Sequence, residues 1–316
     1  MSGPAILVAI INYRTPSLAI EALRSIIPEL DGEHRRAVLV DNGSADGSAE
    51  RLALAITAEG WQDRVALLPL VDNRGFGAGN NAAVAYAGTH GFAPDLIWFL
   101  NPDAIAAPDA LAELVAFFAA HPQAGIAGTA IDDPKGSTVC SAFRFPTPLG
   151  EMESVLGLAF VTRLLEPKVI APEPLTAVAT TDWVSGASLM IRTALYERLG
   201  GFDEGYFLYF EETDLCRRAA ALGASCHYVP DARVIHLSGQ SSGATEAERN
   251  RQRRPLHWFQ SRARYYHKHL GRGALLYASL AWLLAYPPGR IMAHARGRAS
   301  VQPPRLWRDM LRYGWR

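Results

Sequence analysis

Four short apolar runs alternate with segments of helical spacing in the first 130 residues, and this order is the strongest constraint on the fold. The runs are Ile6–Ile11, Ala37–Val40, Val65–Leu70 and Leu96–Leu100. Strands without polar alternation are buried on both faces, and a β-α-β-α order gives a mostly parallel sheet with right-handed crossovers. The sequence therefore predicts an α/β fold with a mostly parallel central sheet flanked by helices.

The segments between these runs and the second half of the chain supply the other elements. Thr15 precedes a proline, which is typical of a helix start. We expect helices from Thr15 to about Ile27 and over Gly47–Thr57, Ala78–Ala87, Pro108–Ala120 and Glu211–Leu222, and strands over Trp183–Ile191, Ser225–Val229 and Arg233–His236. Residues 131–181 are rich in proline and poorly periodic, so we interpret them as an insertion or flap.

The formal net charge is zero, but the charges are unevenly distributed. Residues 249–316 carry fourteen Arg and Lys268 against Asp309 alone, a net charge of +14, which leaves −14 on residues 1–248. The neutral total therefore combines an acidic body with a strongly basic tail.

The cysteines and the apolar segments bear on the compartment. The three cysteines have no CxxC spacing, so neither a disulfide framework nor a cysteine-rich metal site is expected. The first apolar run has no basic flank before it and reads as a strand rather than a signal peptide. The run Ala274–Tyr286 has thirteen residues, whereas a spanning helix needs about 20. We expect a cytoplasmic protein.

Polar residues follow each of the four apolar runs. The four segments are Asn12–Arg14, Asp41–Ser48, Asp72–Asn81 and Asn101–Asp103. Such residues also close ordinary turns, but four clusters at the carboxyl ends of parallel strands lie where open sheets bind ligands. The glycines at 75, 77 and 79 are spaced GxGxG after the third run, which argues against a nicotinamide-binding loop of the GxGxxG type.

Seven ordered segments carry a resemblance to a known family. They are VAIINYRTPSLAIEAL, VLVDNGSADGSAERL, VDNRGFGAGNNAAVAYA, IWFLNPDA, DWVSGASLMIR, GGFDEGYFLYFEETDLCRRAAALG and VIHLSGQSSG. Over about residues 5–243 the chain resembles family 2 glycosyltransferases of the GT-A fold, most closely their rhamnosyltransferase-like branch. The resemblance implies a nucleotide-binding half (1–130), a flap (131–181) and an acceptor and catalytic half (182–245). These form one catalytic domain, residues 1–245, before a helical tail, residues 246–316.

The resemblance also assigns a donor and an acceptor side. Asp41 would hold the nucleoside of a dTDP- or UDP-linked sugar. The residues expected at the donor are Asn12, Arg14, Asp41, Asn73, Arg74, Gly75, Phe76, Asn80 and Asn101. Trp183, Gly186 and Ala187 would line the acceptor side, although a tryptophan here could equally belong to the core.

A divalent cation is expected from the same resemblance. Asn101-Pro102-Asp103 stands where the family has its DxD metal motif, with Asn101 in place of the first acid. Asp103 would bind Mg²⁺ or Mn²⁺, which neutralises the charge that develops on a diphosphate leaving group. His236 would complete the metal site, although a lone histidine is more often a packing or surface residue.

Glu212 is the expected general base. The acids at 211, 212 and 214 open a helix, where they would also stabilise the helix N-terminus. In the family the second acid of this motif takes the proton of the acceptor hydroxyl, a role that falls on Glu212, while Glu211 orients the acceptor. One carboxylate base and a metal-held leaving group imply a single displacement with inversion.

The basic tail has three candidate partners. Arginines and aromatic residues interleave through residues 249–298, beside the apolar run. This composition favours an anionic membrane surface, at the inner face of the cell membrane, over nucleic acid. The alternative is that the tail docks on the acidic body or in a homo-oligomer contact.

The expected function is therefore transfer of a sugar, with rhamnosyl favoured, from a nucleotide-diphosphate donor to a glycan or polyprenyl-diphosphate-linked acceptor in cell-surface polysaccharide synthesis. A sugar-phosphate nucleotidyltransferase is a second hypothesis, but it needs a glycine-rich loop after the first strand, and Asn12–Pro16 contains no glycine. A non-catalytic nucleotide-sugar or membrane-binding module is a third.

Overall fold

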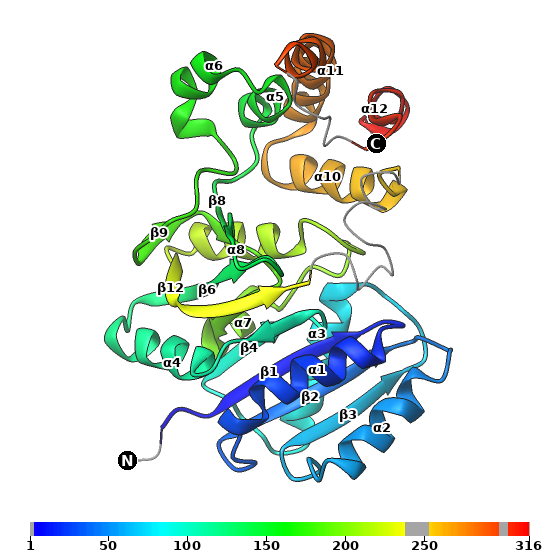
Figure 1. The fold of residues 1–316 in the computed structure, drawn as a ribbon, viewed down its shortest axis with the longest axis vertical. Helices are drawn as coiled ribbons and strands as arrows, with labels where there is room; N and C mark the ends of the chain where they lie inside the picture. The colour runs from blue at the N-terminus through cyan, green and yellow to red at the C-terminus, as the bar shows by residue number, and fades with distance from the viewer. Residues whose placement is uncertain (1–2, 238–252, 297–302, 316) are drawn as a thin grey trace.

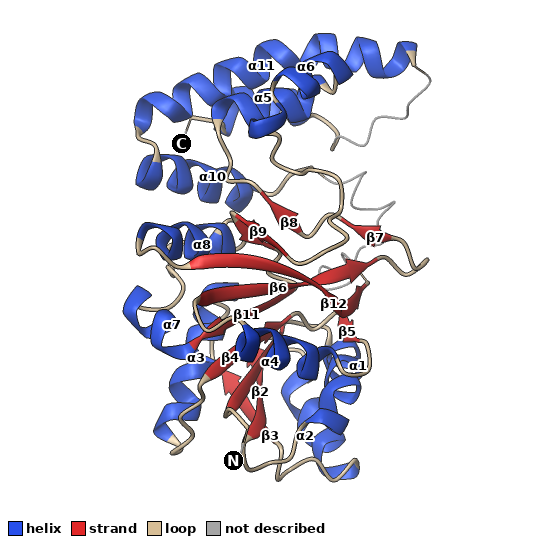
Figure 2. Ribbon diagram, turned by 90° about the vertical axis from the view of Figure 1, so that its left-hand side faces the viewer, coloured by secondary structure: helices blue, strands red, loops and turns tan. Residues whose placement is uncertain are grey.

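The computed structural model describes residues 3–237, 253–296 and 303–315 of the 316-residue chain. The 245/246 boundary, Arg249, Arg251 and the end of the segment VIHLSGQSSG lie outside the described residues. A ten-stranded mixed sheet runs through the body of the molecule, and a layer of helices lies beyond one side of it (Figures 1 and 2).

One half of the sheet is parallel, as predicted. Its strands are β3 (Val65–Leu70), β2 (Arg35–Asn42), β1 (Ile6–Asn12) and β4 (Leu96–Leu100), in that order. The other half continues with β11 (Ser188–Arg192), β6 (Ala124–Asp132), β12 (Ser225–His236) and β5 (Ala104–Ala106). Strand β11 is antiparallel to both β4 and β6, and β12 is parallel to β6. All four apolar runs therefore form strands.

Short strands extend this sheet and form a second one. Strands β7 (Thr138–Val139) and β9 (Ala179–Thr181) pair with β6 and β12. Strands β8 (Ala142–Phe143) and β10 (Trp183–Val184) make a separate two-stranded sheet.

Alternate residues of the central strands face two different helical layers. In β1, the residues at 6, 8 and 10 pack with α1 (Pro16–Ile26), α2 (Ser48–Ala58) and α4 (Ala110–Ala120). The residues at 7, 9 and 11 pack with α3 (Phe76–Thr89), α7 (Thr193–Leu199) and α8 (Glu211–Ala221). The period of two in a strand places neighbouring side chains on opposite faces, so the uninterrupted apolar runs match a sheet buried on both sides.

Two expectations about the strands differ from the structure. The segment Trp183–Ile191 is broken by a turn at residues 185–187 into β10 and β11. The two short strands expected after residue 224 form one strand, β12, whose register shifts between Val229 and Arg233. Pro230 lies in that interval and has no N–H for a ladder hydrogen bond.

The capping interaction at the start of α1 also differs from the expected one. Thr15 stands at the N-cap, but its side chain makes no capping bond. Instead the Thr15 N–H donates to the side-chain oxygen of Asn12 at 3.1 Å. Asn12 therefore ties the end of β1 to the start of the helix.

The segment 131–181, expected to be poorly periodic, contains two helices. They are α5 (Pro148–Leu156) and α6 (Ala159–Leu164), followed by the 3₁₀ turn η2 (Glu166–Lys168); a similar turn, η1 (Ile27–Glu29), follows α1. Helix α5 packs against α11 (Arg272–Ala295) so closely that a Cβ on Gly289 would lie 2.3 Å from the carbonyl oxygen of Val155. With α10 (Leu256–His269) and α12 (Leu306–Tyr313), these helices form a layer that we call the helical cap (Figure 1).

Several basic residues of the tail are neutralised within the chain. Arg262, which is fully buried, pairs with Glu151 of α5 at 2.6 Å. Arg264 and Lys268 both pair with Asp203 at 2.7 Å. Part of the basic tail thus docks on the acidic body, as one of the three alternatives for the tail predicts. None of the helices in the described part of the chain combines the length and the apolar character that crossing a membrane requires.

Candidate active site

The carboxyl ends of β1 and β2 hold a buried polar cluster around Asp41. The Asn12 amide donates to Asp41 Oδ1 at 2.7 Å, and the Ser44 hydroxyl donates to the same oxygen at 2.5 Å. Arg14 has a left-handed backbone (φ +59°), and its N–H donates to Ser44 Oγ at 2.9 Å. Three of the expected donor residues, Asn12, Arg14 and Asp41, are therefore brought together. Ser44, which joins them, was not singled out from the sequence, although it lies in the polar segment after the second strand.

The glycine-rich turn before α3 lies against the loop that leads to α8. Gly75 has φ +100°, and a Cβ there would lie 2.3 Å from the carbonyl oxygen of Phe207. The N–H of Phe76 donates to that same oxygen at 3.0 Å. The Asn42 amide donates both to Asn73 Oδ1 and to the Gly75 carbonyl, each at 3.1 Å. Glycine is required at 75 because both the backbone angle and the close approach exclude a side chain.

The two remaining expected residues of this turn differ in environment. The Asn80 amide donates to the carbonyl of Phe76 at 3.1 Å, whereas its Oδ1 is buried without a hydrogen-bond partner among the described residues. Arg74 is largely exposed and pairs with Glu204 at 2.7 Å. Asn80 thus supports the turn, and Arg74 lies at its surface.

Asp103 and His236 meet beyond the end of β4. The imidazole Nε2 of His236 lies 3.2 Å from Asp103 Oδ1, and the Asp103 side chain is fully buried. Pairing of β5 with β12, which sets Ala104 opposite His236, positions the two residues although 133 positions separate them in sequence. The two proposed metal ligands are therefore neighbours.

This pair fits a divalent cation that another molecule also ligates. A carboxylate oxygen suits Mg²⁺ or Mn²⁺, and an imidazole suits a transition metal. Within the described residues no three His, Cys, Asp or Glu side chains are grouped to hold a metal. Asp103 and His236 would hold such a cation together with water and phosphate oxygens, which Mg²⁺ commonly takes as ligands.

Glu211 and Glu212 open α8 after two residues with strained backbone. Tyr209 and Phe210 have φ values of +73° and +69°, which bulky side chains rarely adopt. Such strain persists only where surrounding contacts impose it, and it clusters at functional sites. Here it turns the chain so that Glu212 lies beside Gly186, where an added Cβ would lie 3.7 Å from the Glu212 carboxyl carbon.

Burial sets the protonation of the two glutamates. Burial raises the pKa of Glu212 to about 7, and burial together with the neighbouring charge of Glu212 raises the pKa of Glu211 well above its usual range. The Oε2 atom of Glu211 is buried with no hydrogen-bond partner among the described residues. A carboxylate whose pKa lies near neutrality is suited to act as a general base.

Asp214, the third acid of this turn, has a different role. Burial raises its pKa, but hydrogen bonds from Lys268 and Arg218 outweigh that effect and leave the pKa below its ordinary value. Arg218 donates to it at 2.7 Å. Asp214 is therefore a charged structural residue that binds α8 to the helical cap.

The acceptor-side residues border the same region. The turn at residues 185–187 carries Gly186 beside Glu212, and the carbonyl of Ala187 accepts the N–H of Asn101 at 2.9 Å. Trp183 stacks on Phe143 with ring centroids 4.2 Å apart, and its indole N–H donates to the carbonyl of Arg144. One face of the Trp183 ring is thus occupied, and its contact with an acceptor stays a prediction.

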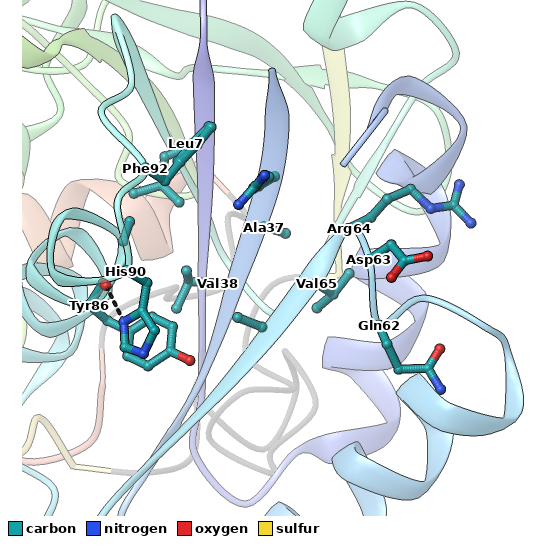
Figure 3. Close-up of a pocket in the computed structure, with 13 residues that line it drawn as sticks. Leu7, Ala37, Val38, Gln62, Asp63, Arg64, Val65, Tyr86, His90 and Phe92 are labelled. Atoms are coloured by element: carbon teal, nitrogen blue, oxygen red, sulfur yellow. Dashed lines mark hydrogen bonds between the residues drawn. The ribbon is translucent and has the colours of Figure 1, made fainter. Parts of the chain in front are cut away.

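A pocket elsewhere on the sheet is separate from this region. It lies near the amino ends of β1, β2 and β3, and Tyr86 and His90 of the α3 segment line it together with Arg64 (Figure 3). His90 Nδ1 lies 2.8 Å from the carbonyl oxygen of Tyr86. None of the expected site residues lines this pocket.

Sequence comparisons identify the family. Residues 4–254 match the model described as "Glycosyltransferase like family 2". The N-acetylglucosaminyl-diphospho-decaprenol L-rhamnosyltransferase of Mycobacterium tuberculosis is 33% identical over 226 residues, 66% of this chain and 69% of that protein. Rhamnosyltransferase WbbL of Escherichia coli is 33% identical over 168 residues, 52% of this chain and 61% of that protein.

A solved structure supports the fold. The mannosyltransferase PcManGT from Pyrobaculum calidifontis, in complex with GDP-Man and Mn²⁺, superimposes with a TM-score of 0.60 at 22% identity, covering 95% of this chain and 77% of that one. The predicted GT-A fold is therefore confirmed. The family match supports a glycosyltransferase rather than the nucleotidyltransferase or the non-catalytic module. The chain belongs to glycosyltransferase family 2, and it is a glycosyltransferase with relatives that transfer rhamnose.

Proposed function

We propose that this glycosyltransferase moves a rhamnosyl unit from a nucleotide-diphosphate sugar to a lipid-linked glycan, with inversion at the anomeric carbon. The observation that carries the proposal is that three groups lie at one edge of the sheet: the Asp41 cluster, Asp103 with His236, and Glu212. Asn101 comes two residues before Asp103. Its N–H donates to the carbonyl of Ala187, which lies in the turn beside Glu212. The Asp41 cluster lies at the ends of neighbouring strands.

The donor would bind across the strand ends. Asp41 is oriented by Asn12 and Ser44. Its second oxygen, Oδ2, accepts the Ser44 N–H at 3.3 Å and has a further lone pair that would accept a hydrogen bond from a base or ribose. The turn over Asn73–Phe76 would shape the nucleotide pocket, because Gly75 lets the backbone approach closely. Asp103 and His236 would hold a divalent cation, and such a cation neutralises the charge of a departing diphosphate.

Glu212 would take the proton from the acceptor hydroxyl. Its elevated pKa makes the carboxylate a stronger base than an exposed glutamate, and about half of it is ionised at neutral pH. Glu211, whose pKa is raised well above its usual range by burial and by the charge of Glu212, would orient the acceptor through a hydrogen bond. With Glu212 as the base and its neighbour Glu211 orienting the acceptor, the proposed roles correspond to direct displacement with inversion.

The acceptor class comes from a relative. The Mycobacterium tuberculosis protein is named for a sugar on a diphospho-decaprenol. An enzyme with an acceptor of that class would work at a membrane surface. The exposed side of the helical cap is the part of this chain that would contact it.

One face of α11 fits an anionic membrane surface. Leu276, Leu280 and Leu284 are 53%, 47% and 76% exposed, and their spacing of four places them on one side of the helix. Arg272 and Arg290 lie at the two ends of this stretch. Apolar side chains flanked by arginines are typical of helices that lie in the membrane interface. In flotation with anionic liposomes, Leu284→Asp should reduce binding, whereas Leu54→Asp at an equally exposed site on α2 should not; equal binding by both would contradict this placement.

Thermal shift measurements with nucleotide sugars test the donor assignment. We expect a dTDP- or UDP-linked sugar to raise the melting temperature in the presence of Mn²⁺, because a ligand that binds only the folded state stabilises it by mass action. Asp103→Ala should abolish the metal-dependent part of the shift. A shift that is the same with and without Mn²⁺, or that survives in Asp103→Ala, would contradict the proposed metal site.

A further inference from the structure

Two basic side chains at the start of α10 differ from the other cations of this helix. Arg264 and Lys268 pair with Asp203, and the adjacent Arg253 pairs with Asp309. Arg254 and His257 have no carboxylate partner within the described ranges 3–237, 253–296 and 303–315. Within the described part of the chain, the tail thus pairs several of its basic groups with carboxylates but not these two.

The geometry leaves a side-chain nitrogen of each residue without a hydrogen-bond partner in the described chain. The Arg254 guanidinium lies over the Trp258 ring, 5.0 Å from its centroid, and its Nε is buried without a hydrogen-bond partner in the described chain. A ring face attracts the charge but leaves the in-plane N–H groups available. The His257 ring lies 5.5 Å from Phe207 and 5.7 Å from Tyr209, and its Nε2 is buried and likewise unpartnered in the described chain.

Leaving these groups unpaired has a cost. Burial lowers the pKa of Arg254 and the pKa of His257, because the surroundings disfavour the charged form of each side chain. Buried polar atoms without partners are rare in proteins, and an absent ion is one of the ordinary explanations. The two unpartnered nitrogens are covered, whereas the rest of each side chain keeps partial exposure, so an anion would meet the remaining N–H groups of Arg254 first.

The position of the pair connects it to the catalytic helix. The rings of Phe207 and Tyr209 that border His257 belong to the loop that ends at Glu211 and Glu212. The hydroxyl of Ser261 on α10 donates to the carbonyl of Leu208 at 3.0 Å, which fixes the helix to this loop. The pair therefore lies at the edge of the helical cap that contacts the loop leading to the base.

We propose that Arg254 and His257 form an anion subsite that binds the diphosphate of the acceptor. Arginine and histidine donors suit phosphate oxygens, and no carboxylate of the described chain competes for them. The donor diphosphate belongs at Asp103 and His236, at the end of β4. A lipid-linked acceptor held at Arg254 would direct its sugar to Glu212 and its prenyl chain to the cap. This assignment rests on the proposed lipid-linked acceptor.

Binding of inorganic pyrophosphate in the presence of EDTA tests the subsite without catalysis. Titration calorimetry should show binding to the wild-type chain, weakened about tenfold or more in Arg254→Gln, because a hydrogen bond to a charged group is lost. Arg253→Gln, which removes the neighbouring arginine that is already paired with Asp309, is the matched control and should bind like the wild type. Equal pyrophosphate affinity in Arg254→Gln and wild type would overturn the proposal.

Steady-state kinetics distinguish the two sources of diphosphate. With dTDP-rhamnose as donor and N-acetylglucosaminyl-diphospho-farnesol as acceptor, Arg254→Gln should raise the acceptor KM about tenfold and leave the donor KM within about twofold. A raised donor KM with an unchanged acceptor KM would overturn the acceptor assignment. If the wild type transfers nothing to this acceptor, the proposed function fails, while the calorimetric result still decides whether the subsite exists.

A second variant guards against misfolding. Arg254→Lys keeps the charge and loses the planar fork, so it should retain intermediate pyrophosphate affinity. Loss of binding in the glutamine variant with retention in the lysine variant supports an anion subsite. If both variants keep the wild-type melting temperature and lose pyrophosphate affinity equally, the subsite requires the guanidinium itself. Wild-type affinity in both folded variants contradicts the proposal.

Discussion

Replacing Glu212 by glutamine should stabilise the folded protein at alkaline pH. When folded, Glu212 keeps its proton up to about pH 7, whereas in the unfolded chain it releases the proton near its ordinary pKa of 4.5. Between these values the folded state binds more protons than the unfolded state, so stability falls as the pH rises. Glutamine is neutral at every pH and escapes this loss.

The size of the effect follows from the same shift. A pKa raised from 4.5 to about 7 corresponds to an upper limit of about 3 kcal/mol. The adjacent Glu211, itself raised in pKa by burial and by the charge of Glu212, should gain from the substitution as well. We therefore expect Glu212→Gln to be more stable than the wild type by about 1–3 kcal/mol at pH 8, and by little at pH 4.5.

Urea unfolding followed by tryptophan fluorescence at pH 4.5 and 8 measures this difference. Glu197→Gln on α7, where the glutamate is exposed, is the matched control and should change stability by less than about 0.5 kcal/mol at both pH values. If Glu212→Gln were no more stable than the wild type at pH 8, Glu212 would not occupy the desolvated position that its role as base requires.

Three further predictions concern packing, backbone and pH. Arg262→Met leaves Glu151 buried without its partner, and it should cost about 3–5 kcal/mol in urea unfolding. Gly75→Ala meets both a φ of +100° and the Phe207 carbonyl, so it should cost about 1–3 kcal/mol and raise the donor KM. The transfer kcat/KM should decline below about pH 7 as Glu212 becomes protonated, which a pH–rate profile measures.

Each of these has a control or a contrary result. Arg264→Gln breaks a partly exposed pair and should cost under about 1 kcal/mol, so an equal cost for Arg262→Met would contradict the importance of the buried pair. Gly47→Ala also has a positive φ (+85°) but open space around it, and it should leave the donor KM unchanged. A kcat/KM that stays constant between pH 5 and 8 would argue against Glu212 as the ionising base.

The parallel half of the sheet could be predicted because its strands are buried on both faces. The runs at Ile6–Ile11 and Leu96–Leu100 carry no polar residue, so no alternative surface strand competes with the prediction. The polar residues that follow the apolar runs had to gather at one edge, so the sequence was sufficient to predict that Asp41 and Asn101 lie there. The composition of each segment was sufficient to predict this half of the sheet, because its topology follows from the βαβ order.

Other features depend on contacts distant in sequence. Helix α5 is stable through its packing on α11, which the proline-rich composition of residues 131–181 conceals. The role of Ser44 depends on a hydrogen bond across two strand ends. The pairing of Arg262 with Glu151 joins residues 111 positions apart, so the basic tail alone could not distinguish docking from membrane binding.

The strained turn at Tyr209 and Phe210 could not be predicted from the sequence either. Both residues are bulky aromatics, and neither favours a positive φ. The rings of α10 that pack on this loop, such as Trp258 against Phe210, hold it in place. The conformation that sets the direction of Glu212 is therefore a product of tertiary packing.

The most direct test of the central claim is the rate of sugar transfer by Glu212→Gln, measured beside its affinity for the donor in the presence of Mn²⁺. The account predicts that kcat falls by about 10²–10⁴-fold while the donor Kd stays within about twofold of the wild type. A glutamine variant that binds donor and transfers sugar at the wild-type rate would contradict it.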